Sequence, residues 1–215
     1  MAELNEEQIQ RYARHIVLQE VGGVGQAALL DAKVLVVGAG GLGSPMLMYL
    51  VAAGVGTIGL VDDDEVSLSN LQRQIAHGTP DIGRAKVNSA RDRVLALNPE
   101  ITFVPHITRL NSGNVMDLLT DYDIIADGTD NFDSRFLLND ACFLAGKTLV
   151  SAAVLRFDGQ LSTYKAYLGP PHPCYRCIFP EPPPPDSIPS CAQGGVLGAM
   201  AMALCQMDPT RDNFR

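Results

Sequence analysis

Residues Gly38 to Gly43 form a glycine-rich turn directly after the apolar run 33–37. A glycine turn between a strand and a helix exposes backbone N–H groups that can hold phosphate groups. An acidic cluster, 62–64, ends the next apolar run, and Asp62 stands where it can accept hydrogen bonds from ribose hydroxyls. These features predict a nucleotide site that could serve NAD, FAD, S-adenosylmethionine or ATP.

Polar side chains beyond the acidic cluster indicate which kind of nucleotide this site takes. Asn70, Arg73 and Lys86 follow the second strand on the side where phosphates would lie. Cations neutralise charge on an attacked phosphate and its leaving group, whereas a plain dinucleotide site has no obvious use for them. Taken singly, Arg73 and Lys86 are typical of a surface arginine and a helix-face lysine. Their grouping favours a nucleotide whose phosphates are chemically attacked.

A second acidic segment, 127–131, follows the apolar run 124–126. Acids at the carboxyl end of a strand in an open α/β sheet face the ligand crevice, so one of them could hold Mg²⁺ on the phosphates. Alternatively, Thr129 or Asp130 caps a helix that begins at residue 132. The two roles are compatible.

The chain contains five cysteines and no recognisable leader, which favours reduced thiols. Cys174 and Cys177 have the CxxC spacing of half a zinc site. Cys191 lies in a proline-rich loop, where it is either an exposed reactive thiol or an ordinary loop residue. Cys142, beside other apolar residues on a helix, is expected in the core.

Composition limits the classes of protein to consider. With 215 residues, 47% of them hydrophobic, the chain suits one domain with a substantial core. A net charge of −8 without a basic stripe argues against nucleic-acid binding. The apolar stretches are too short to span a bilayer, and the acidic N-terminus lacks a signal peptide. We therefore expect a cytoplasmic protein.

Strands and helices that alternate along the chain must position these residues. Strands are expected at 33–37, 57–62, 101–107, 122–126 and 147–152, and helices at 42–53, 84–97, 112–120 and 132–145. This alternation predicts an α/β fold with a doubly wound, Rossmann-like, mostly parallel sheet. Pro105 places its strand at a sheet edge or a bulge.

The N-terminal segment is expected to be helical. Asn5, the acids after it and Gln8 have the pattern of a helix start, and the helix is expected to end near Gly22.

The C-terminal part differs from the rest of the chain in composition and in predicted secondary structure. Residues 153–157 and 160–167 predict an antiparallel hairpin around Asp158 and Gly159. Residues 169–189 are rich in proline and predict an extended loop without helix, before a helix at 193–206. We expect a single domain with a helical arm (1–30), a nucleotide-binding core (31–152) and an antiparallel extension with a proline-rich loop (153–215).

The sequence resembles the ThiF/MoeB/HesA family, the bacterial relatives of ubiquitin-activating enzymes. The matching segments, in the family's order, are 11–16 (RYARHI), 38–44 (GAGGLGS), 61–74 (VDDDEVSLSNLQRQ), 83–86 (GRAK), 127–131 (DGTDN) and 173–177 (PCYRC). Within the family, the resemblance is strongest to the molybdopterin-synthase adenylyltransferases.

The resemblance implies ATP- and Mg²⁺-dependent adenylation of a ubiquitin-like sulfur-carrier protein that ends in Gly-Gly. The carrier's carboxylate attacks the α-phosphate, pyrophosphate leaves, and an acyl-adenylate remains for sulfur transfer. A carboxylate is already a nucleophile at pH 7, so the enzyme mainly aligns two anions and stabilises charge. The small subunit of molybdopterin synthase is the first candidate carrier, and the ThiS-type carrier of thiamine biosynthesis is the second. The alternatives are a nucleotide- or carrier-binding protein without turnover and an NAD-dependent oxidoreductase.

The resemblance also implies roles for individual residues. Gly41 would approach the nucleotide, Asp62 would hold the ribose, and Asp130 would coordinate Mg²⁺. The nucleotide-binding residues implied are Gly41, Asp62, Asp64, Asn70, Arg73, Gln74, Lys86 and Asp130, and the catalytic residues implied are Arg14, Arg73, Lys86, Asp130 and Cys191.

Other implied roles depend on a second subunit or on further ligands. Arg14 would reach across a homodimer to the partner's ATP, as an arginine finger does. Cys191 matches a loop cysteine that some members use in a thioester or persulfide step. The family completes a zinc site with a second CxxC, and the printed sequence supplies only Cys174 and Cys177, so the zinc site is expected to be incomplete.

Overall fold

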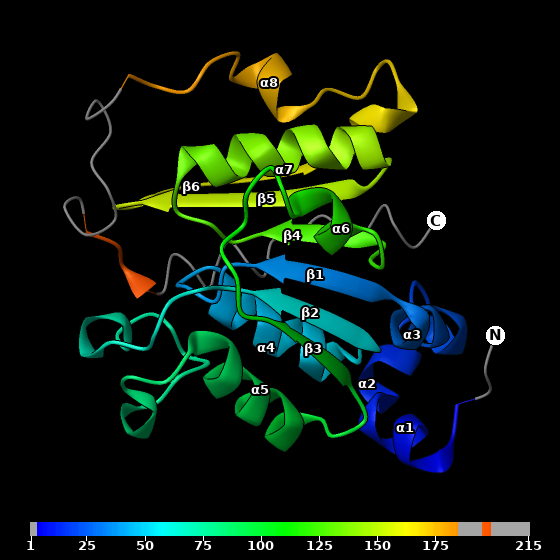
Figure 1. The fold of residues 1–215 in the computed structure, drawn as a ribbon. Coiled ribbons are helices and arrows are strands. Elements are labelled where there is room, and N and C mark those ends of the chain that lie inside the picture. The colour runs from blue at the N-terminus through cyan, green and yellow to red at the C-terminus, as the bar shows by residue number, and fades with distance from the viewer. Residues whose placement is uncertain (1–3, 185–194, 199–215) are drawn as a thin grey trace.

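A sheet of parallel strands with one antiparallel strand at its edge forms the centre of the protein (Figure 1). The computed structural model describes residues 4–184 and 195–198. Along the chain, the strands are β1 (Lys33–Val37), β2 (Thr57–Val61), β3 (Thr102–His106), β4 (Ile124–Asp127), β5 (Thr148–Leu155) and β6 (Asp158–Tyr164). Across the sheet, their order is β3-β2-β1-β4-β5-β6. Only the β5–β6 pair is antiparallel among these strands. The expected doubly wound α/β fold is confirmed, and Pro105 lies on the edge strand β3 as expected.

Helices cover both faces of this sheet. They are α4 (Gly43–Ala53) and α5 (Lys86–Leu97) on one face, and α6 (Val115–Leu119) and α7 (Phe132–Ala145) on the other. Val34 and Val36 of β1 belong to the core under α4 and α5, and Leu35 and Val37 belong to the core under α6 and α7. Because successive strand residues point to opposite faces, a strand covered on both sides must be apolar throughout.

The N-terminal segment contains separate helices where one was expected. They are α1 (Glu6–Arg11), α2 (Ala13–Ile16) and α3 (Gly22–Asp31). The predicted start is confirmed, because Asn5 and Gln8 form a reciprocal capping box. The predicted end near Gly22 was wrong, since α1 ends at Arg11, α2 ends at Ile16, and a further helix begins at Gly22.

Tyr12 explains why the first helix is interrupted. Its ring is buried against Gly54, where any Cβ would overlap the ring, and its hydroxyl accepts a hydrogen bond from Asn98 Nδ2 at 2.9 Å. These contacts hold Tyr12 in a non-helical conformation between α1 and α2 and attach the segment to the C-terminal ends of α4 and α5.

The hairpin turn lies two residues earlier than the sequence indicated. The turn is formed by Arg156, which has φ = 55°, and Phe157, while Asp158 and Gly159 are the first residues of β6. Strand β5 continues to Leu155, so the antiparallel pairing begins with Leu155 opposite Asp158.

The expectation of a helix-free loop over 169–189 was also wrong. The short 3₁₀ helix η3 (Ala166–Leu168) precedes this loop, and helix α8 (Tyr175–Ile178) lies inside it. Asn139 of α7 accepts the N–H of Tyr175 at 2.7 Å, and the buried Tyr175 ring packs edge-on against Phe136. Tertiary packing therefore stabilises one helical turn among the prolines. The helix expected at 193–206 lies outside the described residues apart from 195–198.

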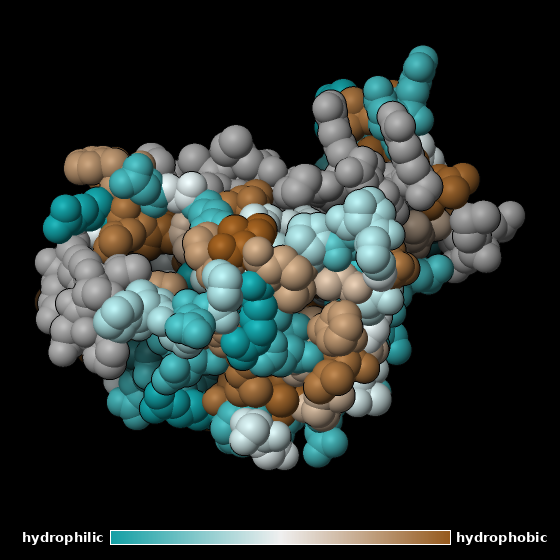
Figure 2. All heavy atoms as spheres, turned by 90° about the horizontal axis from the view of Figure 1, so that it is seen from above, coloured by the Kyte–Doolittle hydropathy of each residue, from teal (hydrophilic) through white to brown (hydrophobic). Residues whose placement is uncertain are grey.

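The segment between β2 and α5 is irregular, as expected, with the 3₁₀ helices η1 (Leu68–Asn70) and η2 (Thr79–Asp81). Among the described residues, no helix is both long and apolar enough to cross a membrane. Seen from above, apolar side chains form separate clusters between hydrophilic ones (Figure 2). Exposed apolar residues of α7, η3 and α8 include Phe143, Leu144, Leu168 and Ile178.

Candidate functional site

The glycine turn lies at the carboxyl end of β1, between β2 and β4. The N–H of Gly38 donates to the carbonyl of Val61 in β2 at 2.8 Å, and Gly38 has φ = +94°. A Cβ at Gly43 would overlap the carbonyl oxygen of Gly38, and a Cβ at Gly128 would lie 2.9 Å from the nitrogen of Gly43. Glycine at these positions therefore lets the turn close tightly under the loop that follows β4.

Asp62 binds the turn through its carboxylate. One oxygen accepts the N–H of Ala39 at 2.8 Å, and the other accepts the N–H of Asp64 at 2.8 Å. Burial raises the pKa of Asp62, although these N–H groups and the charge of Lys86 oppose that rise. A carboxylate offers about four acceptor positions, so two remain for hydroxyl groups.

Two cations from distant parts of the chain lie beside the turn. The side chain of Lys86, the first residue of α5, is only 6% exposed, and its ammonium donates to Asp64 Oδ2 at 2.7 Å. The side chain of Arg73 lies over Gly41, since a Cβ there would be 3.1 Å from Arg73 Cδ. The guanidinium of Arg73 also donates to the carbonyl of Ser69 at 3.2 Å. The structure thus brings Lys86 and Arg73 to the glycine turn, as the sequence predicted.

Gln74 and Asn70 lie in the same loop. Gln74 is 3% exposed and lies against Gly40, while its Oε1 has no hydrogen-bond partner among the described residues. The backbone carbonyl of Asn70 accepts the N–H groups of both Arg73 and Gln74 at 3.0 Å. This single turn sets the direction of both side chains.

The two aspartates of segment 127–131 differ in environment. Asp127 is buried and is bound by Arg135 Nε at 3.3 Å and by the hydroxyl of Ser151 at 2.7 Å, so its carboxylate is occupied. Asp130 is exposed, and within the described part of the chain it has no ion pair or side-chain hydrogen bond. Asn131 caps α7, so the prediction that Thr129 or Asp130 does so was wrong.

The parallel strands all begin at one end of the sheet, called here the amino edge, and finish at the other, the carboxyl edge, where the glycine turn lies. Arg14 lies at the amino edge. It is an exposed residue of α2, and its neighbour His15 is bound to Gln26, whose amide donates to the carbonyl of Ala53 at the end of α4. The glycine turn leads into the opposite end of α4 (Figure 1). Arg14 is therefore not brought to the glycine turn of its own chain.

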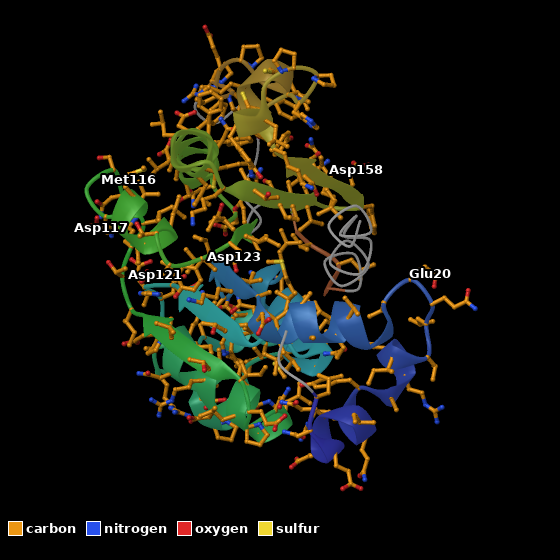
Figure 3. The ribbon with its side chains drawn as sticks, turned by 90° about the vertical axis from the view of Figure 1, so that its right-hand side faces the viewer. Glu20, Met116, Asp117, Asp121, Asp123 and Asp158 are labelled. Atoms are coloured by element: carbon orange, nitrogen blue, oxygen red, sulfur yellow. The ribbon has the colours of Figure 1, made fainter. Side chains whose placement is uncertain are left out.

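Acidic side chains gather near that amino edge. Asp117, Asp121 and Asp123 lie around α6 and the start of β4, and Asp123 accepts the N–H of Lys33 at 2.9 Å (Figure 3). Lys147 lies among these acids, because its ammonium donates to the carbonyls of Thr120 and Tyr122.

His77, which no sequence motif indicated, is buried beside the turn. Its Nε2 lies 3.1 Å from the carbonyl oxygen of Ala39, and its Nδ1 lies 2.9 Å from the hydroxyl of Ser89 in α5. Burial lowers the pKa of His77, against the carbonyl of Ala39, which raises it. His77 lies within a polar loop, which has no periodic pattern of apolar residues that could have indicated a buried side chain.

The cysteines divide into a surface pair and a core residue. The Sγ atoms of Cys174 and Cys177 are 3.6 Å apart at the start of α8, and both are free thiols. Cys142 is buried as predicted, and burial raises its pKa to about 12. Cys191 lies outside the described residues.

The strand order and the glycine turn at its switch point define a Rossmann-like α/β protein with its ligand crevice at the carboxyl edge of the sheet. Within this class, the sequence matches the ThiF family over residues 12–208. The chain belongs to the ThiF family.

Named relatives agree with this assignment. The chain is 50% identical over 207 residues to "Probable adenylyltransferase/sulfurtransferase MoeZ" of Mycobacterium tuberculosis, covering 95% of the chain and 52% of that protein. It is 48% identical over 196 residues to "Sulfur carrier protein adenylyltransferase" of Thermus thermophilus, covering 90% of the chain and 72% of that protein. The chain thus spans about half the length of the mycobacterial relative.

A solved structure shares the fold. It is the E. coli tRNA N6-threonylcarbamoyladenosine dehydratase TcdA in complex with ATP, with a TM-score of 0.67 and 26% identity. The match covers 75% of this chain and 65% of that one.

Proposed function

We propose that this domain uses ATP and Mg²⁺ to adenylate the C-terminal Gly-Gly carboxylate of a ubiquitin-like sulfur-carrier protein. A carboxylate oxygen forms a bond to the α-phosphorus, the bond from that phosphorus to the bridging oxygen breaks, and pyrophosphate leaves. The name of the Thermus relative supports a sulfur carrier as substrate, and the ATP complex of the E. coli neighbour supports the nucleotide.

The observation that carries the proposal is the convergence of Lys86 and Arg73 on the glycine turn. A nearly buried ammonium whose described partner is a 68% exposed carboxylate, Asp64, can transfer its hydrogen bonds to a phosphate at little cost. Arg73 over Gly41 adds a second cation next to the N–H groups of Gly40 and Gly41, which donate to no group in the described part of the chain. Together with Asn70, these groups would offset the charge that develops on the leaving pyrophosphate.

Asp62 and Gln74 suit the nucleoside side of the site. The two acceptor positions left on Asp62 would take ribose hydroxyls, and the buried unpartnered Oε1 of Gln74 would take a donor from the ligand. An orphaned buried oxygen in this position fits a site that a ligand completes.

Asp130 is the residue proposed to hold Mg²⁺. It follows β4 at the carboxyl edge and is exposed, whereas Asp127 is occupied by Arg135. When bound there, the metal would neutralise charge on the pyrophosphate. Asp130 therefore fits a hard oxygen ligand for the cation.

Arg14 is proposed to act in trans within a homodimer. Because it lies at the amino edge, the only nucleotide it could reach is one bound to another subunit. Exposed Val17 and Val24 flank it on α3 and the loop before α3, and burial against a second copy would remove this apolar surface from water.

Cys174 and Cys177 are proposed to supply two ligands to a zinc ion. Two sulfurs on a tetrahedral zinc, each at about 2.3 Å from it, lie ~3.8 Å apart. The observed separation is 3.6 Å. Zinc analysis of the purified protein tests this, and a content far below one zinc per chain contradicts it. A covalent role for Cys191 stays a prediction.

ATP–pyrophosphate exchange with purified carriers tests the function. We expect exchange with the small subunit of molybdopterin synthase, weaker exchange with a ThiS-type carrier, and none with a carrier that lacks its terminal glycine. ATP binding without exchange on any carrier would favour a binding protein without turnover. NAD binding in place of ATP would favour an oxidoreductase.

A further inference from the structure

His77 occupies a central position that the proposed reaction does not yet use. It is 7% exposed and follows the turn that carries Arg73 and Gln74. Its ring lies between Ala39 of the glycine turn and Ser89 of α5, with one nitrogen directed at each.

The two contacts determine which nitrogen carries the proton. A carbonyl oxygen can only accept, so the Nε2 of His77 must donate to Ala39. In the neutral ring, Nδ1 is then an acceptor, and it lies 2.9 Å from the hydroxyl of Ser89, which also hydrogen-bonds Asp81. Ser89 is one turn after Lys86 on α5, so the same ring contacts the helix that carries the buried cation.

The carbonyl of Ala39 accepts hydrogen bonds from more than one donor. Besides His77, the hydroxyl of Ser44 donates to it at 3.1 Å. On the other side of the residue, the N–H of Ala39 donates to Asp62 at 2.8 Å. The backbone of Ala39 is therefore fixed at both of its polar groups.

Fixing this carbonyl also fixes the next N–H group. The peptide unit is planar and trans, so the carbonyl of Ala39 and the N–H of Gly40 point in opposite directions. With the carbonyl directed inward at His77 and Ser44, the N–H of Gly40 points away from them. Neither Gly40 nor Gly41 donates its N–H within the described part of the chain, and both residues are partly exposed.

We propose that His77 is a positioning residue that, through the carbonyl of Ala39, directs the N–H of Gly40 at a phosphate of the nucleotide. That the ligand is a nucleotide rests on the proposed function. That His77 orients the N–H of Gly40 rests on the backbone geometry. Through Ser89, the same ring keeps α5, and with it Lys86, in register with the glycine turn.

The test compares His77→Ala with His77→Gln. Glutamine keeps an N–H donor near the position of Nε2, so it should retain the hydrogen bond to Ala39. His106→Gln is the matched control, because His106 is also partly buried but bonds Tyr122 through Nε2 at 2.8 Å. Amide hydrogen exchange of residues 38–43, equilibrium ATP binding and pyrophosphate exchange are measured for each variant.

We expect His77→Ala to speed amide exchange in 38–43 and to raise the Kd and KM for ATP about tenfold, with a smaller change in kcat. The loss is partial because Ser44 still donates to Ala39. His77→Gln should recover most of both effects, and His106→Gln should show neither. Equal behaviour of His77→Ala and His77→Gln, or an unchanged KM in His77→Ala, would overturn the proposal.

The measurements separate this proposal from the proposed function. If the wild-type protein catalyses no exchange with any carrier, the adenylation assignment fails. Hydrogen exchange and ATP binding would still report whether His77 positions the turn. If wild-type exchange is normal and residues 38–43 are unaffected by His77→Ala, the positioning role alone fails.

Discussion

The two edges of the parallel sheet satisfy their polar groups in different ways. At the amino edge, Tyr12 is paired with Asn98, and His15 is paired with Gln26, which in turn bonds the carbonyl of Ala53. Beside the glycine turn, at the carboxyl edge, the Oε1 of Gln74 is buried without a partner among the described residues; the hydroxyl groups of Thr163 and Tyr164 on the antiparallel strand β6 share this property. Buried polar groups are nearly always hydrogen-bonded, and the open oxygen of Gln74 lies against Gly40 of the glycine turn, where a bound ligand would complete it.

Charge distinguishes the edges further. The surface near the start of β4 carries Asp117, Asp121 and Asp123, whereas Arg73 and Lys86 lie beside the glycine turn. Arg73 and Lys86 supply positive charge next to the glycine turn, where the phosphates of a nucleotide would lie. One edge therefore holds the fold together and the other is arranged for binding, with Arg14 as the exception that a second subunit would explain.

The strongest test of this comparison is Lys86→Met, which keeps much of the side-chain volume and removes the charge. Pyrophosphate exchange should fall about a thousandfold, because a cation that stabilises phosphoryl charge contributes on that scale. The fold should persist, since the ion-pair partner Asp64 is 68% exposed and can be solvated. Arg93→Met removes an exposed charge from the same helix and should leave exchange unchanged. A near-normal rate in Lys86→Met would contradict the assignment of the carboxyl edge.

Arg14→Ala tests the exception at the amino edge. Exchange should fall about a hundredfold if this side chain acts on the nucleotide of another subunit. Mixing and re-annealing the Arg14→Ala and Lys86→Met proteins should then restore about a quarter of the wild-type rate, because half the dimers would be mixed and each would have one intact site. The absence of any recovery, with mixed dimers shown by native mass spectrometry, would contradict action in trans.

Tyr12→Phe probes the edge that we assign to structure. The variant loses the hydroxyl that accepts from Asn98, which should lower the free energy of unfolding by about 1 kcal/mol. Asn98 still donates to the carbonyl of Val51 at 3.1 Å, so the loss is limited. Urea denaturation measures the stability, and ATP affinity should stay at the wild-type value. A marked loss of ATP affinity would mean that the two edges are not separate in function.

The smallest expected effect is a change in the pH dependence of stability. Burial lowers the pKa of His77 below its usual 6.5 in the folded protein, so below about pH 6.5 the unfolded chain binds a proton that the folded chain does not. This difference lowers the free energy of unfolding as the pH falls, and it is absent at higher pH. Asp62, Asp81 and Lys86 are the charged groups that face the ring, and the two acids partly offset the effect.

His77→Gln should therefore lose less stability than the wild type between pH 7.5 and 5.5. The pKa of His106 is lowered in the same direction by burial, and this contribution remains in both proteins. Urea denaturation at the two pH values measures the difference. Parallel curves for the two proteins would show that His77 does not titrate differently in the folded state.

Much of the fold could be predicted because the sheet is covered on both faces. A strand such as β1 is then apolar at each of its buried positions, 34–37, and the glycine turn marks its end. Helix α7 occupies residues 132–145 as expected, since it has an asparagine cap at its start and a glycine at its end. The start of the N-terminal helix was also correct, because Asn5 and Gln8 form a local capping box.

The predictions of secondary structure were wrong where contacts with distant residues override the local conformational preference of the chain. Tyr12 interrupts a helix because of its contacts with Gly54 and Asn98, which are far away in the sequence. The prolines around α8 predicted a loop, but Asn139 and the buried Tyr175 stabilise a helical turn there. In both places, the residues that decide the conformation lie outside the local sequence pattern.

The type of fold, the glycine turn and the proposed nucleotide-binding residues Asp62, Arg73 and Lys86 could be predicted from the sequence, because each prediction depends on local spacing and side-chain chemistry. The tertiary structure decided which charges act together. It occupied Asp127 with the buried Arg135 and left Asp130 exposed. It also placed Arg14 beyond the reach of its own turn, and it set His77 under Ala39. These decisions depend on strand order, which brings together residues that lie tens of positions apart in the chain.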